Sequence, residues 1–246
     1  HPAFNLLALF WINGKRKAMW IHDFISLAYP RICACCGNSL WKGEEVICTL
    51  CEYRLPKTWY HLEHDNPVSQ IFWGRARVES ATSYLHFNKG NMVQHLIHHL
   101  KYRERKDVGV WLGSHYGTYL KKSLLFCSAE AIIPVPLHRK KQRLRGFNQS
   151  EQFGIGLALS MKLPLEVQTL YRNSVSETQT RKARYKRWEN VSGIFEVRNT
   201  GKLAGRHLLL VDDVITTGAT LEACVHALSS IPDVMISVAT IASTRN

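Results

Sequence analysis

The sequence has no apolar run that approaches the roughly 20 residues a membrane-spanning helix needs, so no membrane span is expected. It also lacks the features of a secretory signal, because no basic stretch precedes the apolar segment at residues 5–12 and no small-residue cleavage site follows it. The first residue is histidine, and Met19 is the expected native start. We therefore expect a soluble protein in which residues 1–18 are an extension without an assigned role, and need not be native.

Acidic residues are scarce relative to basic ones. The 246 residues include 32 Lys and Arg against 19 Asp and Glu, which gives a formal net charge of +13. Hydrophobic residues make up 46% and charged residues 21%, a mix that excludes a disordered chain and permits one large domain or a medium domain with a small companion. The basic surplus suits an anionic partner such as a nucleic acid or a polyphosphate, while a solvated basic surface is the alternative.

Cysteines occur in an odd number, seven, and five of them fall within residues 33–51. This arrangement argues against the disulfide framework of a secreted protein and favours a reduced, cytoplasmic environment with one metal site. Two C-x-x-C pairs can place four thiolates around one Zn²⁺. The expected zinc ligands are Cys33, Cys36, Cys48 and Cys51.

The extra thiol of Cys35 leaves an alternative open, because it could replace Cys33 or Cys36 in a shifted register. The C-x-x-C spacing favours Cys33 and Cys36 as the ligands. Gly37 follows them, where such a turn needs a residue in the left-handed conformation. Four thiolates leave no open coordination position, so we expect a structural zinc ribbon. The ribbon is expected to act either as a docking or nucleic-acid-binding module or as a brace for the N-terminus.

Strand-like and helix-like patterns alternate along the rest of the chain. The expected strands lie at residues 76–87, 130–138, 206–214 and 234–242. Helical patterns occupy residues 91–126, as two helices, and residues 151–163 and 221–230. This order predicts an α/β fold with a mostly parallel sheet flanked by helices.

Three histidines within the first helical pattern, His95, His98 and His99, have a spacing that can hold a metal. No nearby glutamate is arranged as in H-E-x-x-H. We therefore interpret them as a polar or partly buried helix face.

Cations crowd the segment that follows the expected strand at residues 130–138. They are Arg139, Lys140, Lys141, Arg143 and Arg145, with no acid among them. We expect a basic loop between a strand and a helix, which is an arrangement that binds anions. A solvated basic turn is the alternative.

A second basic segment covers residues 178–195. Its nucleic-acid-binding candidates are Arg181, Lys182, Arg184, Tyr185 and Trp188. Cations beside aromatic rings suit single-stranded DNA, which binds through charge and base stacking. A mobile flap is the other interpretation.

The segment LLLVDDVITTGAT, residues 208–220, combines an apolar strand, two carboxylates and a hydroxyl-rich turn. Lacking G-x-x-x-x-G-K and G-x-G-x-x-G, it is neither a Walker A loop nor a dinucleotide fingerprint. The backbone and hydroxyls of Thr216, Thr217, Gly218, Ala219 and Thr220 can bind a phosphate. Asp212 and Asp213 would repel that phosphate, but they suit the hydroxyls of an attached sugar or a shared metal ion. The ligand expected here is a ribose 5-phosphate.

This segment resembles the ribose-phosphate loop of type I phosphoribosyltransferases. Together with CACCG…CTLC, HLKYRERKD, IIPVPLHRKKQRLRGFNQSE and TQTRKARYKRWENVSGIF, in that order, it resembles the competence protein F (ComF) family. The resemblance covers about residues 24–242, nearly the whole chain. Cys35 and the segment SSIPDV depart from the family pattern, and neither touches the ligand loop.

The resemblance implies a type I phosphoribosyltransferase fold behind an N-terminal zinc ribbon. It also implies binding of phosphoribosyl pyrophosphate (PRPP) with Mg²⁺ and a role in DNA uptake during natural transformation, with DNA-uptake proteins as possible partners. By this analogy Asp212 and Asp213 are the catalytic residues, and residues 216–220 hold the 5-phosphate. The expected pyrophosphate-binding residues are Arg139, Lys140, Arg143 and Arg145.

Two functions remain open from the sequence. One is an enzyme that transfers a phosphoribosyl group to an unknown acceptor, and the other is a non-catalytic sensor of PRPP or a nucleotide that binds single-stranded DNA. The expected parts are the extension at 1–18, a zinc ribbon at 19–60, a linker at 61–75 and a phosphoribosyltransferase-like domain at 76–246.

Overall fold

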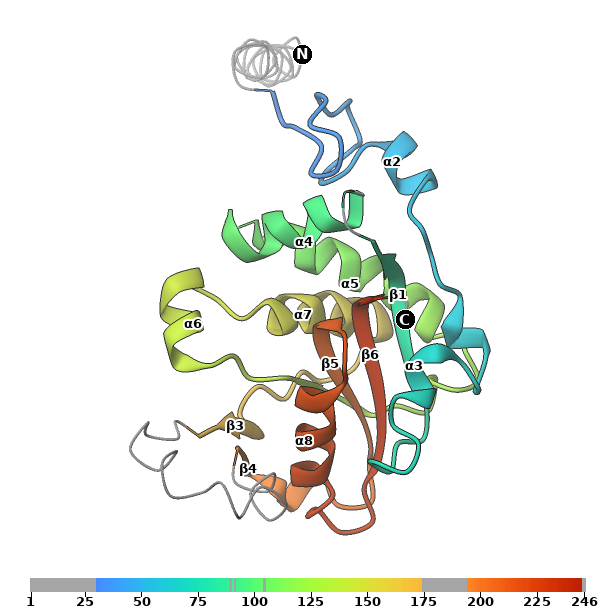
Figure 1. Cartoon of the computed structure of the whole chain (residues 1–246), viewed down its shortest axis with the longest axis vertical. Helices are drawn as coiled ribbons and strands as arrows, with labels where there is room; N and C mark the ends of the chain where they lie inside the picture. Colours follow the sequence, from blue (N-terminus) through green and yellow to red (C-terminus); the bar gives the residue numbers. More distant parts are fainter. Residues whose placement is uncertain (1–29, 89, 91, 104, 174–193, 245–246) are drawn as a thin grey trace, which may run out of the picture. The chain divides into compact units, whose positions relative to one another are not determined.

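The computed structural model describes residues 30–88, 90, 92–103, 105–173 and 194–244 (Figure 1). The chain separates into two compact units, residues 1–53 and residues 54–246. Within the described residues, no helix is both long and apolar enough to cross a membrane.

The described part of the first unit is a small irregular ribbon. An isolated bridge joins Ile32 to Ser39, and the backbone N–H of Ala34 donates to the carbonyl of Val46 at 2.9 Å. One short helix, α2 (Thr49–Tyr53), ends it. So short a segment has little apolar surface to bury, and its fold needs another source of stability.

The second unit is built on a four-stranded parallel sheet. Its strands are β1 (Ala81–Phe87), β2 (Ala131–Pro134), β5 (His207–Ile215) and β6 (Met235–Thr244). Their order across the sheet is β1-β6-β5-β2, and each neighbouring pair is parallel. The inner strands β5 and β6 are buried along most of their length, as expected where helices cover both faces. The predicted α/β fold class is confirmed.

Further helices of the second unit lie around this sheet (Figure 1). They are α4 (Met92–Tyr102), α5 (Lys106–Leu120), α6 (Arg139–Arg145), α7 (Gln149–Met161) and α8 (Ala219–Leu228). The shorter elements are η1 (Tyr60–Leu62), α3 (Pro67–Gln70), η4 (Thr200–Lys202) and an antiparallel pair of β3 (Leu170–Arg172) and β4 (Phe195–Val197).

Helix α7 lies against the face of the sheet that presents Ile132 and Val211, and α8 contributes to the core on the face that presents Ile133 and Leu210. On its outer side α7 packs against α5 through glycines. A Cβ atom at Gly113 would lie 2.1 Å from the carbonyl oxygen of Phe153, so only glycine permits this approach.

The strand register places two chain segments side by side at one edge of the sheet. Pro134, the last residue of β2, pairs with Val211, which directly precedes the two aspartates in β5. The basic segment after β2 therefore leaves the sheet beside the acidic end of β5. Ligands of open parallel sheets bind at this carboxyl edge.

Three boundaries differ from those expected from the sequence. The basic segment after β2 is helical, as α6, because the side chain of His138 caps its first turn and Arg and Lys favour helices. The hydroxyl-rich turn is shorter than residues 216–220, since α8 already begins at Ala219.

The third difference concerns residues 61–75, expected as a linker, which belong to the second unit. Asn66 and Ser69 form a capping box that starts α3, and Val68 and Phe72 are buried in the core. Two isolated apolar residues in a polar segment give no periodic signal, so the sequence did not indicate this packing.

Candidate functional site

Two adjacent carboxylates lie near the carboxyl end of β5, and the protein holds both of them in place. The hydroxyl of Ser150, in the first turn of α7, donates to Asp212 Oδ1 at 2.7 Å, and the backbone N–H of Asp213 donates to the same oxygen at 2.8 Å. The Asp213 carboxylate accepts from the N–H of Val214 at 2.6 Å and pairs with the ammonium of Lys101 at 2.6 Å. The two side chains are thus fixed before any ligand binds.

Burial makes this acid pair sensitive to its surroundings. The pKa of Asp212 is raised from 3.8 to about 7, mainly by burial and then by the neighbouring Asp213 charge, while hydrogen bonds and Lys101 oppose the rise. A buried carboxylate beside a second one is stabilised by hydroxyl donors or a cation. The pair therefore offers hydrogen-bond acceptors that a diol or a metal ion can use.

The turn after β5 forms a cradle next to the acids. Thr216 and Thr217 are exposed, and Gly218 adopts a left-handed conformation with φ of +76° at the start of α8. A Cβ atom at Gly218 would lie 2.4 Å from Ile71 Cγ2, so this position also lacks the space for a side chain. A hollow of about 50 Å³ is lined by Asp212 and residues 214–221. Backbone N–H groups at a helix start favour an anion in such a hollow.

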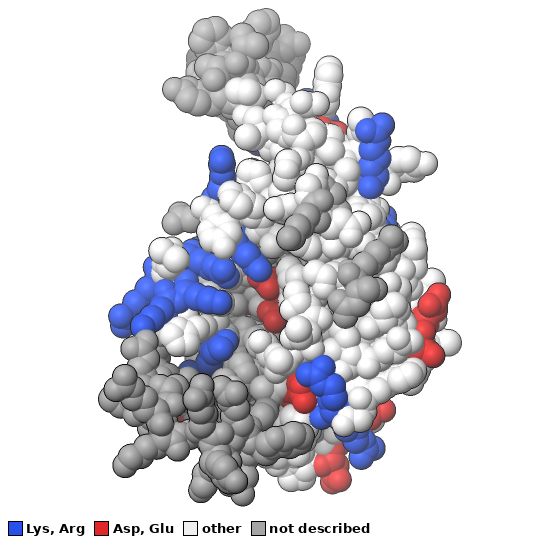
Figure 2. Space-filling model, viewed as in Figure 1, with Lys and Arg blue, Asp and Glu red and all other residues white. Residues whose placement is uncertain are grey.

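Helix α6 supplies positive charge at the same edge of the sheet. Lys140, Lys141 and Arg143 are exposed on it, and of Arg139 the structure describes only the backbone. Figure 2 shows lysine and arginine side chains gathered over α6, beside a recess in which acidic side chains lie. The cations of α6 thus lie near the acid pair, while the lysine that forms an ion pair with Asp213 is Lys101 of α4.

A larger groove of about 700 Å³ adjoins the cradle. It shares Thr216 and Thr217 with the cradle and extends past Ser243 and Thr244 at the end of β6. Its further lining residues are Tyr60, Pro67, Val68, Gln70, Ile71, Trp73 and Arg75. The groove and α6 therefore lie on opposite sides of the acid pair in the strand order, one toward β6 and the other toward β2.

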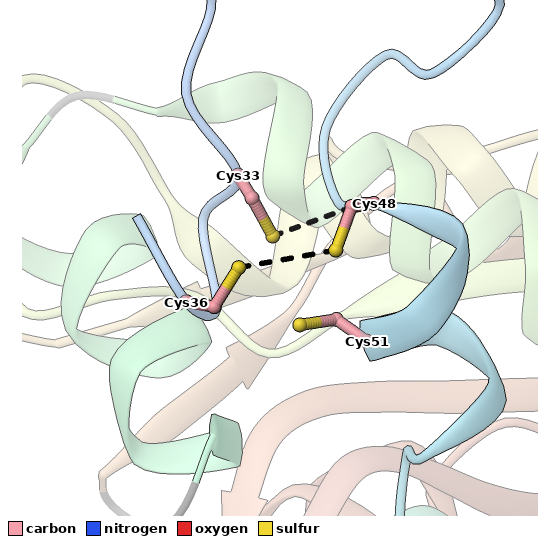
Figure 3. Close-up of side chains that lie close together, drawn as sticks. All are labelled: Cys33, Cys36, Cys48 and Cys51. Atoms are coloured by element: carbon pink, nitrogen blue, oxygen red, sulfur yellow. Dashed lines mark hydrogen bonds between the residues drawn. The ribbon is translucent and has the colours of Figure 1, made fainter. Parts of the chain in front are cut away.

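The four predicted zinc ligands converge in the first unit (Figure 3). The sulfur atoms of Cys33, Cys36, Cys48 and Cys51 all lie within 4.8 Å of one another. Cys35 is not part of this cluster, and its pKa is raised to about 12, chiefly by burial. The left-handed conformation expected at Gly37 is confirmed, with φ of +77°.

The environment of Cys33 suits a metal-bound thiolate. Burial opposes its ionisation, but backbone N–H groups of Cys35 and Cys48 point at its sulfur at 3.4 and 3.3 Å. On balance the pKa of Cys33 is lowered from 9.0 to about 7. Four cysteine sulfurs this close together are the donor set that structural Zn²⁺ requires.

Other sequence candidates have different outcomes. Arg181, Lys182, Arg184, Tyr185 and Trp188 lie outside the described residues. Three histidines of α4 line a pocket of about 370 Å³ with Gln94 and Arg103. Among the residues that the structure describes, the four cysteines are the one group of three or more His, Cys, Asp or Glu side chains whose ligand atoms lie close enough together to hold a metal.

The sequence did not single out two residues that contact the acids, Lys101 and Ser150. Lys101 lies within the segment HLKYRERKD and Ser150 within GFNQSE, both of which contribute to the family resemblance. Neither segment has a spacing that relates it to β5. Only packing of α4 and α7 on the sheet brings them to Asp212 and Asp213.

Comparison with known proteins places this site in a recognised domain. Residues 150–244 match the phosphoribosyl transferase domain family. The chain is 25% identical over 201 residues to the DNA utilization protein YhgH of Shigella flexneri, covering 80% of this chain and 83% of that one. It is 36% identical over 94 residues to competence protein F of Haemophilus influenzae, covering 38% and 41%.

A solved structure of adenine phosphoribosyltransferase from Saccharomyces cerevisiae is 12% identical, with a TM-score of 0.38 over 58% of this chain and 72% of that one. The segment of this chain that matches the domain family begins at Ser150 and includes the acid pair, the cradle and α8. The chain is thus similar to proteins named competence protein F and DNA utilization protein YhgH. Its residues 150–244 match the phosphoribosyl transferase domain family, and its four-cysteine cluster fits a zinc ribbon.

Proposed function

We propose that this protein binds PRPP together with Mg²⁺ and transfers its phosphoribosyl group to an acceptor. One observation carries the proposal: two fixed carboxylates lie directly beside a phosphate-sized hollow at the start of α8. A diol next to a phosphate is the feature of ribose 5-phosphate that matches this pair of sites. The names of the curated relatives, which refer to competence and DNA utilization, support a role in DNA uptake.

Each part of the site has a role in this proposal. Asp212 and Asp213 accept hydrogen bonds from the ribose hydroxyls, while residues 216–220 hold the 5-phosphate. The cations of α6 face the pyrophosphate. Carboxylate and hydroxyl oxygens are ligands that Mg²⁺ accepts, so the donor set of this edge fits that ion.

The transfer breaks the bond between C1 of the ribose and the pyrophosphate oxygen, which leaves with the electron pair. Positive charge develops on the ribose ring, and the two carboxylates stabilise it. The α6 cations stabilise the negative charge on the leaving group, and Mg²⁺ bound with the pyrophosphate would neutralise part of that charge. The acceptor then forms the new bond to C1.

Release of pyrophosphate tests whether the protein is an enzyme. With PRPP, Mg²⁺ and a panel of nitrogen heterocycles and amines, we expect one acceptor to give turnover above the rate without acceptor. Binding of PRPP without turnover for any acceptor would favour the sensor over the transferase.

The groove beside the cradle is the proposed acceptor site. A displacement needs the acceptor and the leaving group on opposite sides of C1, and the groove lies on the side of the acids away from α6. Trp73, which is 59% exposed, and Tyr60 offer aromatic surfaces there, next to the guanidinium of Arg75. These groups suit a planar heterocycle.

We therefore expect a nucleoside 5′-monophosphate to bind more tightly than ribose 5-phosphate, by about tenfold for one stacked base. Trp73→Ala removes this advantage and leaves the affinity for ribose 5-phosphate unchanged, as measured by calorimetry with AMP, GMP, CMP and UMP. Trp41→Ala, which alters an exposed tryptophan of the other unit, is the matched control. An advantage that survives Trp73→Ala would place the acceptor elsewhere.

Binding of single-stranded DNA is a second candidate function, favoured by the net charge of +13. Because such binding releases counterions from phosphates, we expect the affinity for an oligonucleotide to fall by at least about tenfold between 50 and 200 mM salt. Replacing Arg181, Lys182 and Arg184 together by glutamine should flatten this slope, whereas replacing Lys121 and Lys122 should not. A salt-independent affinity measured by fluorescence anisotropy would count against DNA binding.

A further inference from the structure

The end of α4 closes one side of the candidate ribose site. Figure 1 shows α4 lying over the carboxyl end of the sheet, and its penultimate residue, Lys101, places Nζ 2.6 Å from Asp213 Oδ2. The other oxygen of Asp213 accepts from the N–H of Val214. Both oxygens of this carboxylate are therefore oriented by donors of the protein.

A chain of contacts links Lys101 to the other parts of the site. The next residue, Tyr102, lies under the guanidinium of Arg145 at 5.5 Å from the ring centre. Arg145 donates to the side chain of Gln149 at 3.0 Å. Gln149 precedes Ser150, whose hydroxyl donates to Asp212. The ends of α4 and α6 and the start of α7 thus surround the acid pair.

This ion pair differs from an ordinary surface pair. Exposed pairs contribute little, because water screens them and long side chains lose freedom. Here the side chains of Lys101 and Asp213 are only 20% and 15% exposed, and Asp212 lies next to them. An ammonium in this position offsets the repulsion between two adjacent carboxylates, because a nearby opposite charge favours the charged form of a carboxyl group.

We propose that Lys101 is a positioning residue of the phosphoribosyl site, whose ammonium holds the Asp213 carboxylate in the orientation that the ribose hydroxyls need. This role rests on the proposed function of the acid pair. It acts on the sugar end of the ligand, because the 5-phosphate cradle of residues 216–220 belongs to the turn after β5 and the start of α8.

The test compares two probes, ribose 5-phosphate and inorganic phosphate, by calorimetry and competition. Loss of a hydrogen bond to a charged group predicts that Lys101→Gln weakens ribose 5-phosphate binding by about tenfold. Inorganic phosphate, which uses the cradle alone, should change by less than about twofold. Lys101→Arg, which keeps the charge, should restore most of the affinity for ribose 5-phosphate.

Matched variants separate this role from a general effect. Lys122→Gln removes one exposed lysine beyond the end of α5 and should change neither affinity. Lys101→Met, which keeps the apolar stem, is measured alongside, and thermal melting shows which variants fold. A variant that folds and binds both probes normally, or binds ribose 5-phosphate more tightly, would overturn the positioning role. Equal weakening for both probes would also overturn it.

The unaltered protein decides between the two proposals. If it does not bind ribose 5-phosphate, the proposed function fails and the role of Lys101 fails with it. If it binds ribose 5-phosphate and Lys101→Gln has no effect, only the role of Lys101 fails.

Discussion

Replacing both carboxylates, as Asp212→Asn with Asp213→Asn, is expected to weaken PRPP binding in Mg²⁺ by at least about 100-fold, since each hydrogen bond to a charged group contributes about 1.5–3 kcal/mol. Both substitutions keep the shape of the side chain but replace an accepting oxygen by a donating NH₂ group. The ribose hydroxyls then lose their acceptors, and the developing positive charge loses its neighbours. Calorimetry with PRPP and Mg²⁺ measures this effect.

The single variant Asp212→Asn, which keeps the Lys101–Asp213 ion pair, should not be less stable than the unaltered protein at pH 8. The pKa of Asp212 is raised in the folded protein to about 7, so ionising it above that pH costs folding free energy. A carboxyl group whose pKa is higher in the folded than in the unfolded protein makes the folded protein less stable as the pH rises. For Asp212 this loss builds up between pH 3.8 and about 7. Asn at this position removes that loss, and thermal melting at pH 5 and pH 8 measures it.

Asp233→Asn is the matched control for these substitutions. Asp233 is exposed and adopts a positive φ of 53°, a conformation that Asn tolerates well. The Asp233→Asn variant should therefore bind PRPP as tightly as the unaltered protein. Normal PRPP binding by the double variant at Asp212 and Asp213 would contradict the proposed ribose site.

Removing metal from the first unit is expected to unfold its ribbon. The described ribbon buries few side chains, and four sulfur atoms lie within 4.8 Å of one another where an ion would hold them. Structural zinc contributes apparent binding free energies of about 10–16 kcal/mol at neutral pH, far more than so small a core provides. We expect one zinc per chain by elemental analysis, and its chelation should make residues 30–53 susceptible to proteolysis.

Cysteine variants separate ligands from bystanders. Cys36→Ser or Cys48→Ser should abolish zinc binding, whereas Cys35→Ser and Cys127→Ser should keep one zinc per chain, because neither thiol belongs to the cluster. Zinc retained in Cys36→Ser but lost in Cys35→Ser would show that the ligands follow the shifted register. A ribbon that resists proteolysis after chelation would show that metal is not what holds it.

Some features of the fold follow from short stretches of sequence. The apolar run that ends at Asp212 predicted strand β5, and the alternation of strands and helices predicted the parallel sheet. The C-x-x-C spacing indicated which four cysteines would converge. These inferences succeeded because the relevant residues are neighbours in the chain, where periodicity and turn geometry act directly.

Other features were missed because no repeating pattern in the sequence reports them. Residues 61–75 appeared to be a linker, yet Phe72 is buried against the core of the second unit. The basic segment after β2 has no apolar stripe, yet it is a helix whose first turn is capped by the side chain of His138. In both cases a cap or a distant contact, rather than a repeating pattern, determines the local structure.

The acid pair shows most clearly where local information ends. Its two carboxylates, the hydroxyl-rich turn and the expectation of a ribose phosphate can all be inferred from thirteen consecutive residues. That Lys101 and Ser150 hold these carboxylates can be seen only after α4 and α7 pack on the sheet. A hydrogen bond or ion pair depends on distances of a few ångströms between side chains, and only tertiary packing fixes those distances for residues far apart in sequence.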